Sequence, residues 1–161
     1  MTTIDFARRW AETRTSDLAA HRELYAASED FTLENRMVDD HLGDTISTDD
    51  EFAHGLADYV NKNAGNGVGV QTIAVTDAFE GSDHLFVHWD WSVEGAATYR
   101  GVPTDGKTLT STGSTYLKFD DAGKIVLESS FLNENPVFQQ LGLPIITPHY
   151  WEEGFDPASL G

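Results

Sequence analysis

The hydrophobic pattern of this chain changes its period once, near residue 68, and this change limits the possible folds more than any other feature. Before it, apolar side chains recur three and four residues apart, as on one face of an α-helix. After it, alternating segments rich in β-branched and aromatic residues are separated by turns, as in β-strands. Helices followed by an antiparallel meander predict an α+β domain.

Three helical segments are expected in the first part. The first begins near residue 2 or 3 and ends near Thr13, and the second follows an N-cap at Ser16. The third begins at a capping box, in which Thr48 and Glu51 have the required spacing, and ends at the glycines of 64–67. These helices precede every strand of the meander.

Four strands are expected in the second part, at 68–76, 85–93, 108–119 and 124–132. The turns at 80–83 and 120–123 join them into two hairpins. A short helix is expected over 136–141. The prediction is therefore one domain over 1–142 and an extended tail over 143–161, whose aromatic residues dock on an apolar surface: Tyr150, Trp151 and Phe155.

Composition excludes several classes of function. The 161 residues include 27 acidic and 10 basic side chains, for a net charge of −17, which opposes binding to nucleic acid or anionic membranes. This acidity is typical of a solubilising surface or of salt adaptation. With no cysteine, any chemistry must use histidine, carboxylate, amide or hydroxyl groups. No signal or membrane-spanning segment is visible, so a cytoplasmic protein is expected.

Metal and cofactor sites are not predicted. The six histidines are scattered, without the spacing of a metal-binding motif. The glycines of 65–69 lie between a helix and a strand, whereas a nucleotide-binding loop follows a strand and opens a helix. We therefore expect no metal and no cofactor, and a small molecule as the partner.

Three short motifs, in order, carry a family resemblance. They are a Pro-Thr-Asp-Gly-Lys turn at 103–107, Gly-Lys-Ile at 123–125 and Gln-Leu-Gly at 140–142. With them, residues 5–142 resemble the SnoaL-like polyketide cyclases of the nuclear transport factor 2-like superfamily. The resemblance implies a cone-shaped, curled antiparallel sheet packed on three N-terminal helices. It also implies cofactor-independent chemistry on a small apolar carbonyl or polyketide-like substrate in the cone.

The chain departs from this family at its acidic position. The resemblance places the family's general acid/base seven residues before Gln140, where this chain has Asn133. An amide can polarise a carbonyl group but cannot exchange a proton near neutral pH. Two other family positions hold Leu127 and Ser129, which are expected to share a mostly apolar wall of the cone with Phe131 and Asn133.

The segment 84–95, His-Leu-Phe-Val-His-Trp-Asp-Trp-Ser-Val-Glu-Gly, offers another source of chemistry. On a strand, His88 and Asp90 point to one face, while Trp89 and Trp91 point to the other. If the first face lines the cone, His88 can act as general base with Asp90 as its orienter or a second acid, and Asn133 as a carbonyl-polarising donor. The alternative is that the tryptophans line the cavity and His88 and Asp90 lie outside it.

Other side chains are candidates for substrate contact. Glu34 or Asn35 is expected to reach the cavity, unless this segment is an ordinary solvated loop. Tyr99 and Tyr116 can donate hydroxyl hydrogen bonds, whereas Trp10 and Tyr25 are expected to line or cap an apolar chamber. The set of predicted substrate contacts is Trp10, Tyr25, Glu34, Asn35, Trp89, Trp91, Tyr99, Tyr116 and Phe131.

Several functions stay open at this point. The first is a cyclase, isomerase or lyase that transfers a proton without a cofactor. The alternatives are a non-catalytic binder of a lipophilic small molecule, a relative of epoxide hydrolases or dehydratases, and an accessory domain with Trp89 and Trp91 exposed for a partner. An open curved sheet with aromatic residues on both faces also predicts a homodimer through the sheet face.

Overall fold

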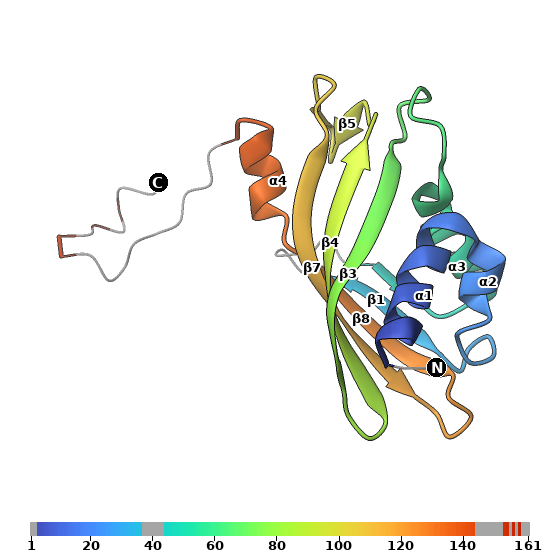
Figure 1. Ribbon diagram of the computed structural model, residues 1–161. Coiled ribbons are helices and arrows are strands. Elements are labelled where there is room, and N and C mark those ends of the chain that lie inside the picture. The colour runs from blue at the N-terminus through green and yellow to red at the C-terminus, as the bar shows by residue number, and fades with distance from the viewer. Residues whose placement is uncertain (1–2, 37–43, 144–152, 155, 157, 159–161) are drawn as a thin grey trace.

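The computed structural model describes residues 3–36, 44–143, 153–154, 156 and 158, and the expected docking of Tyr150, Trp151 and Phe155 lies outside them. Figure 1 shows a strongly curled sheet with helices against one of its faces. The helices are α1 (Thr3–Ser16), α2 (Leu18–Arg22), α3 (Asp49–Gly55), the 3₁₀ helix η2 (Ala57–Val60) and α4 (Asn135–Gln140). No helix among the described residues is long and apolar enough to span a membrane.

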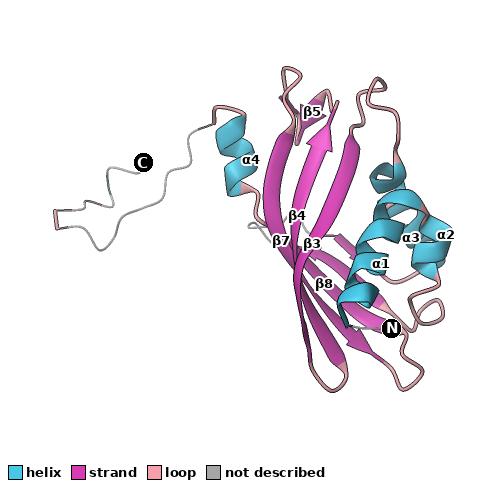
Figure 2. Ribbon diagram, in the orientation of Figure 1, coloured by secondary structure: helices cyan, strands magenta, loops and turns pink. Residues whose placement is uncertain are grey.

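Six strands form the main sheet in the order β2-β1-β8-β7-β4-β3. Their bounds are β1 (Thr32–Arg36), β2 (Asp44–Ile46), β3 (Val70–Glu80), β4 (His84–Glu94), β7 (Leu109–Phe119) and β8 (Ile125–Leu132), and a small hairpin comprises β5 (Thr98–Tyr99) and β6 (Val102–Pro103). Neighbouring strands are antiparallel except β1 and β8, which are parallel. Figure 2 shows α1, α2 and α3 on one side of the sheet and α4 beside β7. The expected α+β cone is confirmed.

Local capping explains where the helices begin. The predicted capping box is present: Glu51 N donates to Thr48 Oγ1 at 3.3 Å, and Thr48 N donates to the Glu51 carboxylate at 3.2 Å. The predicted cap at Ser16 is wrong, because Ser16 still belongs to α1. Asp17 caps α2 instead, accepting a hydrogen bond from Ala20 N at 3.0 Å. α3 ends at Gly55, earlier than expected, and the chain continues as η2.

The face of the sheet that the helices cover forms the core. Along β4, buried residues alternate with half-buried or exposed ones, and the buried ones are Leu85, Val87, Trp89, Trp91 and Val93. The side chains between them, including those of His88 and Asp90, lie on the opposite face, which we call the outer face. The alternation therefore decides between the two hypotheses for this strand, and it places the tryptophans inside.

Gly113 makes room for one of these rings. It lies directly opposite Trp89 in the β4–β7 pairing, and a Cβ atom on Gly113 would be 2.1 Å from the Trp89 ring. We expect Gly113→Ala to lower the free energy of unfolding by about 1–3 kcal/mol, since the ring or the strand must shift. Urea unfolding measures this change.

The neighbouring Ser114 supplies the control, because its side chain points to the outer face. Ser114→Ala is expected to stay within about 0.5 kcal/mol of the parent protein. Equal stability of Gly113→Ala and the parent would contradict the close packing of Trp89 on Gly113.

Candidate functional site

A buried carboxylate, that of Glu128, lies on the inner face of β8 and is 0% exposed. Its Oε2 accepts hydrogen bonds from Trp10 Nε1 at 2.8 Å and from the Tyr25 hydroxyl. Its Oε1 accepts from Arg14 Nη1 at 2.5 Å and from Ser130 Oγ at 2.7 Å. Three of the four donors come from α1 and the residues after α2, so the carboxylate joins the helical layer to the sheet.

Arg14 is the charge partner of Glu128 and is 2% exposed. Its guanidinium also lies 5.5 Å from the ring centroid of Trp10 and 4.8 Å from that of Tyr59. Burial alone would raise the pKa of Glu128, but the Arg14 charge and the hydrogen bonds from Tyr25 and Ser130 outweigh it and lower that pKa. Glu128 is therefore held as an anion.

His21 extends this cluster away from the sheet. Its Nε2 lies 3.2 Å from the Tyr25 hydroxyl, and its Nδ1 lies 3.0 Å from Thr13 Oγ1. Burial, with the charge of Arg14, lowers the pKa of His21 to about 3. Burial and the charge of Glu128 raise the pKa of Tyr25. At neutral pH the imidazole is therefore uncharged and the phenol keeps its proton.

A second branch runs from Glu128 along the inner face of the sheet. Ser130 Oγ and Thr115 Oγ1 are 2.8 Å apart, and Trp89 Nε1 donates to Thr115 Oγ1 at 2.9 Å. Among the described residues, every buried side-chain nitrogen or oxygen has a hydrogen-bond partner. We call Glu128, Arg14, Trp10, Tyr25, His21, Ser130 and Thr115 the interior cluster.

A second buried carboxylate, with fewer partners, lies just after β8, at the start of α4. Glu134 is 2% exposed and accepts hydrogen bonds from the Tyr99 hydroxyl and from Arg100 Nε, the latter at 3.1 Å. Burial and the Glu134 hydrogen bond raise the pKa of Tyr99, whose ring packs against Trp91 and Phe138. Tyr99 therefore holds the β5–β6 hairpin against the start of α4.

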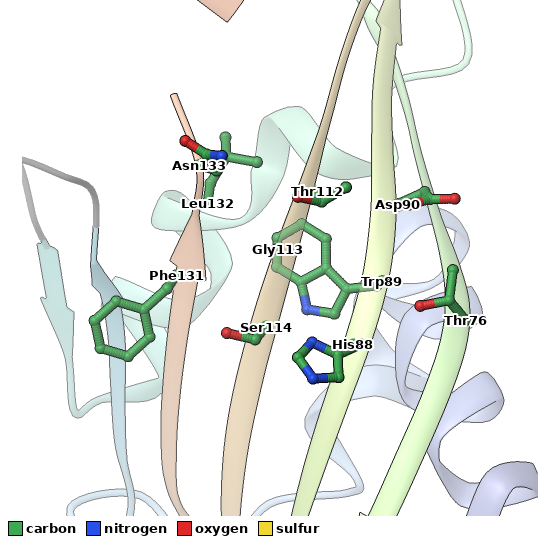
Figure 3. Close-up of a pocket in the computed structure, with 10 residues that line it drawn as sticks. All are labelled: Thr76, His88, Trp89, Asp90, Thr112, Gly113, Ser114, Phe131, Leu132 and Asn133. Carbon is green, nitrogen blue, oxygen red and sulfur yellow. The ribbon is translucent and has the colours of Figure 1, made fainter. Parts of the chain in front are cut away.

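The three predicted catalytic residues do come together, but not in the interior. His88, Asp90 and Asn133 line an open groove of about 550 Å³ on the outer face. Figure 3 shows His88 beside Ser114 of the neighbouring strand, with the other lining side chains around them. The hypothesis that His88 and Asp90 line the cone is wrong, because the pleat of β4 turns them away from the helices. Their catalytic role stays a prediction, and it now applies to an open groove on the outer face and not to the interior of the cone.

Most other predicted contacts on the sheet also lie outside the interior. Glu34 accepts a hydrogen bond from Ser129 Oγ at 3.1 Å, Tyr116 stacks on His84, and Phe131 is 45% exposed. The expected wall of Leu127, Ser129, Phe131 and Asn133 therefore belongs to the outer face. Asn35 belongs to β1, and its side chain lies outside the described part of the structure.

Four predicted contacts do lie in the interior, namely Trp10, Tyr25, Trp89 and Trp91. Burial of the last two overturns the accessory-domain hypothesis, which required them to be exposed. Sequence reasoning missed Glu128, Arg14 and His21. A carboxylate within a run of apolar and small residues on a predicted strand was the available signal, because an isolated charge inside a sheet needs a partner.

No group of three or more metal-ligating side chains is found among the described residues. The interior cluster consists of donors around one carboxylate that Arg14 already neutralises. Several donors converge on the Glu128 carboxylate, and such an arrangement stabilises negative charge. The cluster is therefore suited to hydrogen-bond a neutral group and to transfer a proton to it.

The helices over a curled sheet define the fold of the nuclear transport factor 2-like and ketosteroid isomerase-like proteins, as the sequence motifs predicted. No protein-family model matches the chain, and neither does any curated protein. Solved structures do match by their likeness in fold, and at identities of 14–20% this likeness shows the fold alone.

A phenazine biosynthesis-related protein from Pseudomonas aeruginosa is 18% identical, with a TM-score of 0.69 over 96% of this chain and 92% of its own. A ketosteroid isomerase-like protein from Catenulispora acidiphila, in complex with trimethylamine, is 20% identical, with a TM-score of 0.63 over 89% and 96%. A candidate SnoaL-like polyketide cyclase from Jannaschia is 14% identical, with a TM-score of 0.63 over 89% and 93%.

Proposed function

We propose that this chain is a cofactor-independent enzyme of the cyclase, isomerase or lyase type, which moves a proton on a small apolar carbonyl compound at the interior cluster. One observation carries the proposal: the buried Glu128 carboxylate accepts a hydrogen bond from Tyr25, whose hydroxyl also contacts His21. Buried titratable groups with shifted pKa values are typical of acid–base sites.

The chemistry follows from the hydrogen bonds that a substrate would change. A carbonyl oxygen that accepts the Tyr25 hydrogen bond takes it away from Glu128, and the carboxylate then has a higher pKa, because it has lost a donor. Glu128 can then accept a proton from the carbon next to the carbonyl. Tyr25 meanwhile stabilises the negative charge that develops on the oxygen.

The substrate must displace side chains to reach this position. Trp10 and Glu128 are both 0% exposed, so ligand binding and a rearrangement of the aromatic rings around them are coupled. The surrounding rings favour an apolar ligand, and the net charge of −17 disfavours an anionic one.

Tyr25→Phe tests the proposal directly. We expect it to slow proton exchange at least about 100-fold, since positioned acid–base groups contribute roughly 10²- to 10⁴-fold. The measurement is deuterium incorporation from D₂O next to the carbonyl of a panel of cyclic and aryl ketones, followed by NMR. Tyr116→Phe, which changes a tyrosine of the outer face, is the matched control and is expected to keep the parent rate.

A second function is favoured by a different observation, namely that every described buried polar side-chain atom already has a partner. A site so fully satisfied also suits a carrier of a lipophilic small molecule, in which the interior cluster only supports the fold. A parent protein that binds the ketones without exchanging their protons would contradict the enzyme and favour the carrier.

Self-association is part of the same proposal. The outer face exposes Phe79 at 53% and Phe131 at 45%, and it carries the groove that contains His88 and Asp90. The exposure of these two rings supports the homodimer expected from the sequence, because a dimer through this face would cover both of them.

A further inference from the structure

The hydrogen bonds of the interior cluster determine where its protons lie. Glu128 is ionised and can only accept, so the single hydroxyl proton of Tyr25 points to Glu128 Oε2. The contact between Tyr25 and His21 Nε2 must then have the imidazole as donor. His21 is neutral and carries one ring proton, so its Nδ1 is an acceptor, and Thr13 Oγ1 donates to it.

This pattern is directional. Each group donates toward Glu128: Thr13 to His21, His21 to Tyr25, and Tyr25 to the carboxylate. If each of these groups passes its proton to the next, one proton is in effect transferred from α1 into the interior. The imidazole gains a proton on one nitrogen as it loses one from the other, so it stays uncharged. An imidazolium there is disfavoured by burial and by the nearby Arg14 charge.

The series of hydrogen bonds begins at Thr13, on the half-buried part of α1. Thr13 is intermediate in exposure, unlike Tyr25 and His21, which are buried. Its Oγ1 also lies 2.8 Å from the carbonyl oxygen of Arg9, so its proton can turn between that oxygen and His21 Nδ1. Thr13 is therefore the member of the chain placed to exchange protons with water.

We propose that His21 and Thr13 are positioning residues that return a proton to Tyr25 after it has protonated a substrate oxygen. This inference rests on the proposed function. The Tyr25 O–H bond breaks as the substrate O–H bond forms, and His21 Nε2–H breaks as the Tyr25 O–H bond re-forms. Thr13 Oγ–H breaks as His21 Nδ1–H forms, and a solvent hydronium ion restores the Thr13 hydroxyl. The substrate thus exchanges a carbon-bound proton, which Glu128 now holds, for an oxygen-bound one, and the solvent loses one proton. When Glu128 returns its proton to carbon, the same steps run in reverse, restore His21 Nε2–H and give the proton back to the solvent.

A purely structural role for these residues is the competing explanation. His21 packs in the aromatic core, with its ring centroid 5.3 Å from that of Tyr25 and 5.6 Å from that of Phe52. If packing alone retained them, Thr13→Val and Thr13→Ser would affect proton movement alike. If the relay is correct, only the hydroxyl matters, because valine has nearly the shape of threonine but no proton to give.

The experiment compares the parent protein with Thr13→Val and Thr13→Ser by NMR on ¹⁵N-histidine-labelled protein. We expect His21 to carry its proton on Nε2 in the parent. We expect exchange of that proton with water to slow about 10-fold in Thr13→Val and to stay near the parent rate in Thr13→Ser, since loss of one hydrogen bond corresponds to up to a tenfold effect. A proton on Nδ1, or equal rates in all three proteins, would overturn the relay.

Turnover separates this inference from the proposed function. If Tyr25→Phe abolishes ketone exchange while Thr13→Val retains the parent rate at every pH, the relay is wrong and the enzyme stands. The opposite result is that the parent incorporates no deuterium into any ketone, while exchange of the His21 ring proton with water is slowed in Thr13→Val and not in Thr13→Ser. In that case the proton path is supported and the proposed function is wrong. Thermal unfolding of each variant confirms that the compared proteins are folded.

Discussion

Glu128→Gln is expected to lower the free energy of unfolding by about 3–5 kcal/mol, the cost of leaving a buried charge without its partner. The Arg14 guanidinium would remain 2% exposed, with an uncharged amide in place of the carboxylate. The new NH₂ group would also face other donors, since Glu128 accepts from Trp10 and Tyr25 on the same side. Urea unfolding followed by tryptophan fluorescence measures the loss.

Two further proteins make this result specific. Glu94→Gln changes an exposed carboxylate of β4 and is expected to stay within about 0.5 kcal/mol of the parent. Adding Arg14→Met to Glu128→Gln removes the unpaired charge, so the double variant should be more stable than the sum of the single changes. Strict additivity, or a Glu128→Gln protein as stable as the parent, would contradict a buried ion pair.

The stability of the parent protein is expected to fall steeply as the pH drops from 6.5 toward 3, and His21 accounts for much of the fall. The folded-state pKa of His21 is lowered to about 3, whereas an unfolded histidine titrates near 6.5. Between these values the unfolded chain binds a proton that the folded protein does not, so acid favours unfolding. Between pH 7 and pH 4 this linkage amounts to about 3 kcal/mol.

His21→Gln removes this contribution, so its loss of stability between pH 7 and pH 4 should be about 3 kcal/mol smaller than that of the parent. The lowered pKa of Glu128 also makes stability fall in acid, but it does so in both proteins, because Arg14, Tyr25 and Ser130 hold the carboxylate in both. His54→Gln, which changes an exposed histidine of α3, is the control. Parallel curves for the parent and His21→Gln would show that His21 is not buried in its neutral form.

Much of the fold could be predicted because its signals are local. The Thr48–Glu51 capping box acts within one helical turn, and Gly123 takes a φ of 75° in the turn where the chain needs it. The strands follow from alternation between turns, which is also local. The parallel pairing of β1 with β8 is not local, and no pattern in the short segment Thr32–Arg36 indicated it.

The site could not be predicted because it depends on which face of each strand is covered. On β4 both faces carry rings, with Phe86 and His88 on one and Trp89 and Trp91 on the other, so hydrophobicity alone does not choose. On β8 a register shift opposite Lys118 and Phe119 lets both Ile125 and Glu128 face inward, although they are three residues apart. Simple alternation from Ile125 points to Leu127 and Ser129 instead.

The ion pair between Arg14 and Glu128 also has a consequence for synthesis of the chain. The two residues are separated by 114 positions, and the strand that carries Glu128 lies in the middle of the sheet but is the last of the described strands along the chain. While the ribosome is still making the chain, α1 has no carboxylate to neutralise its arginine, and β1 has no β8 to pair with. The buried ion pair therefore forms only when nearly the whole domain has been translated, so the protein should reach its final packing late and as one cooperative unit.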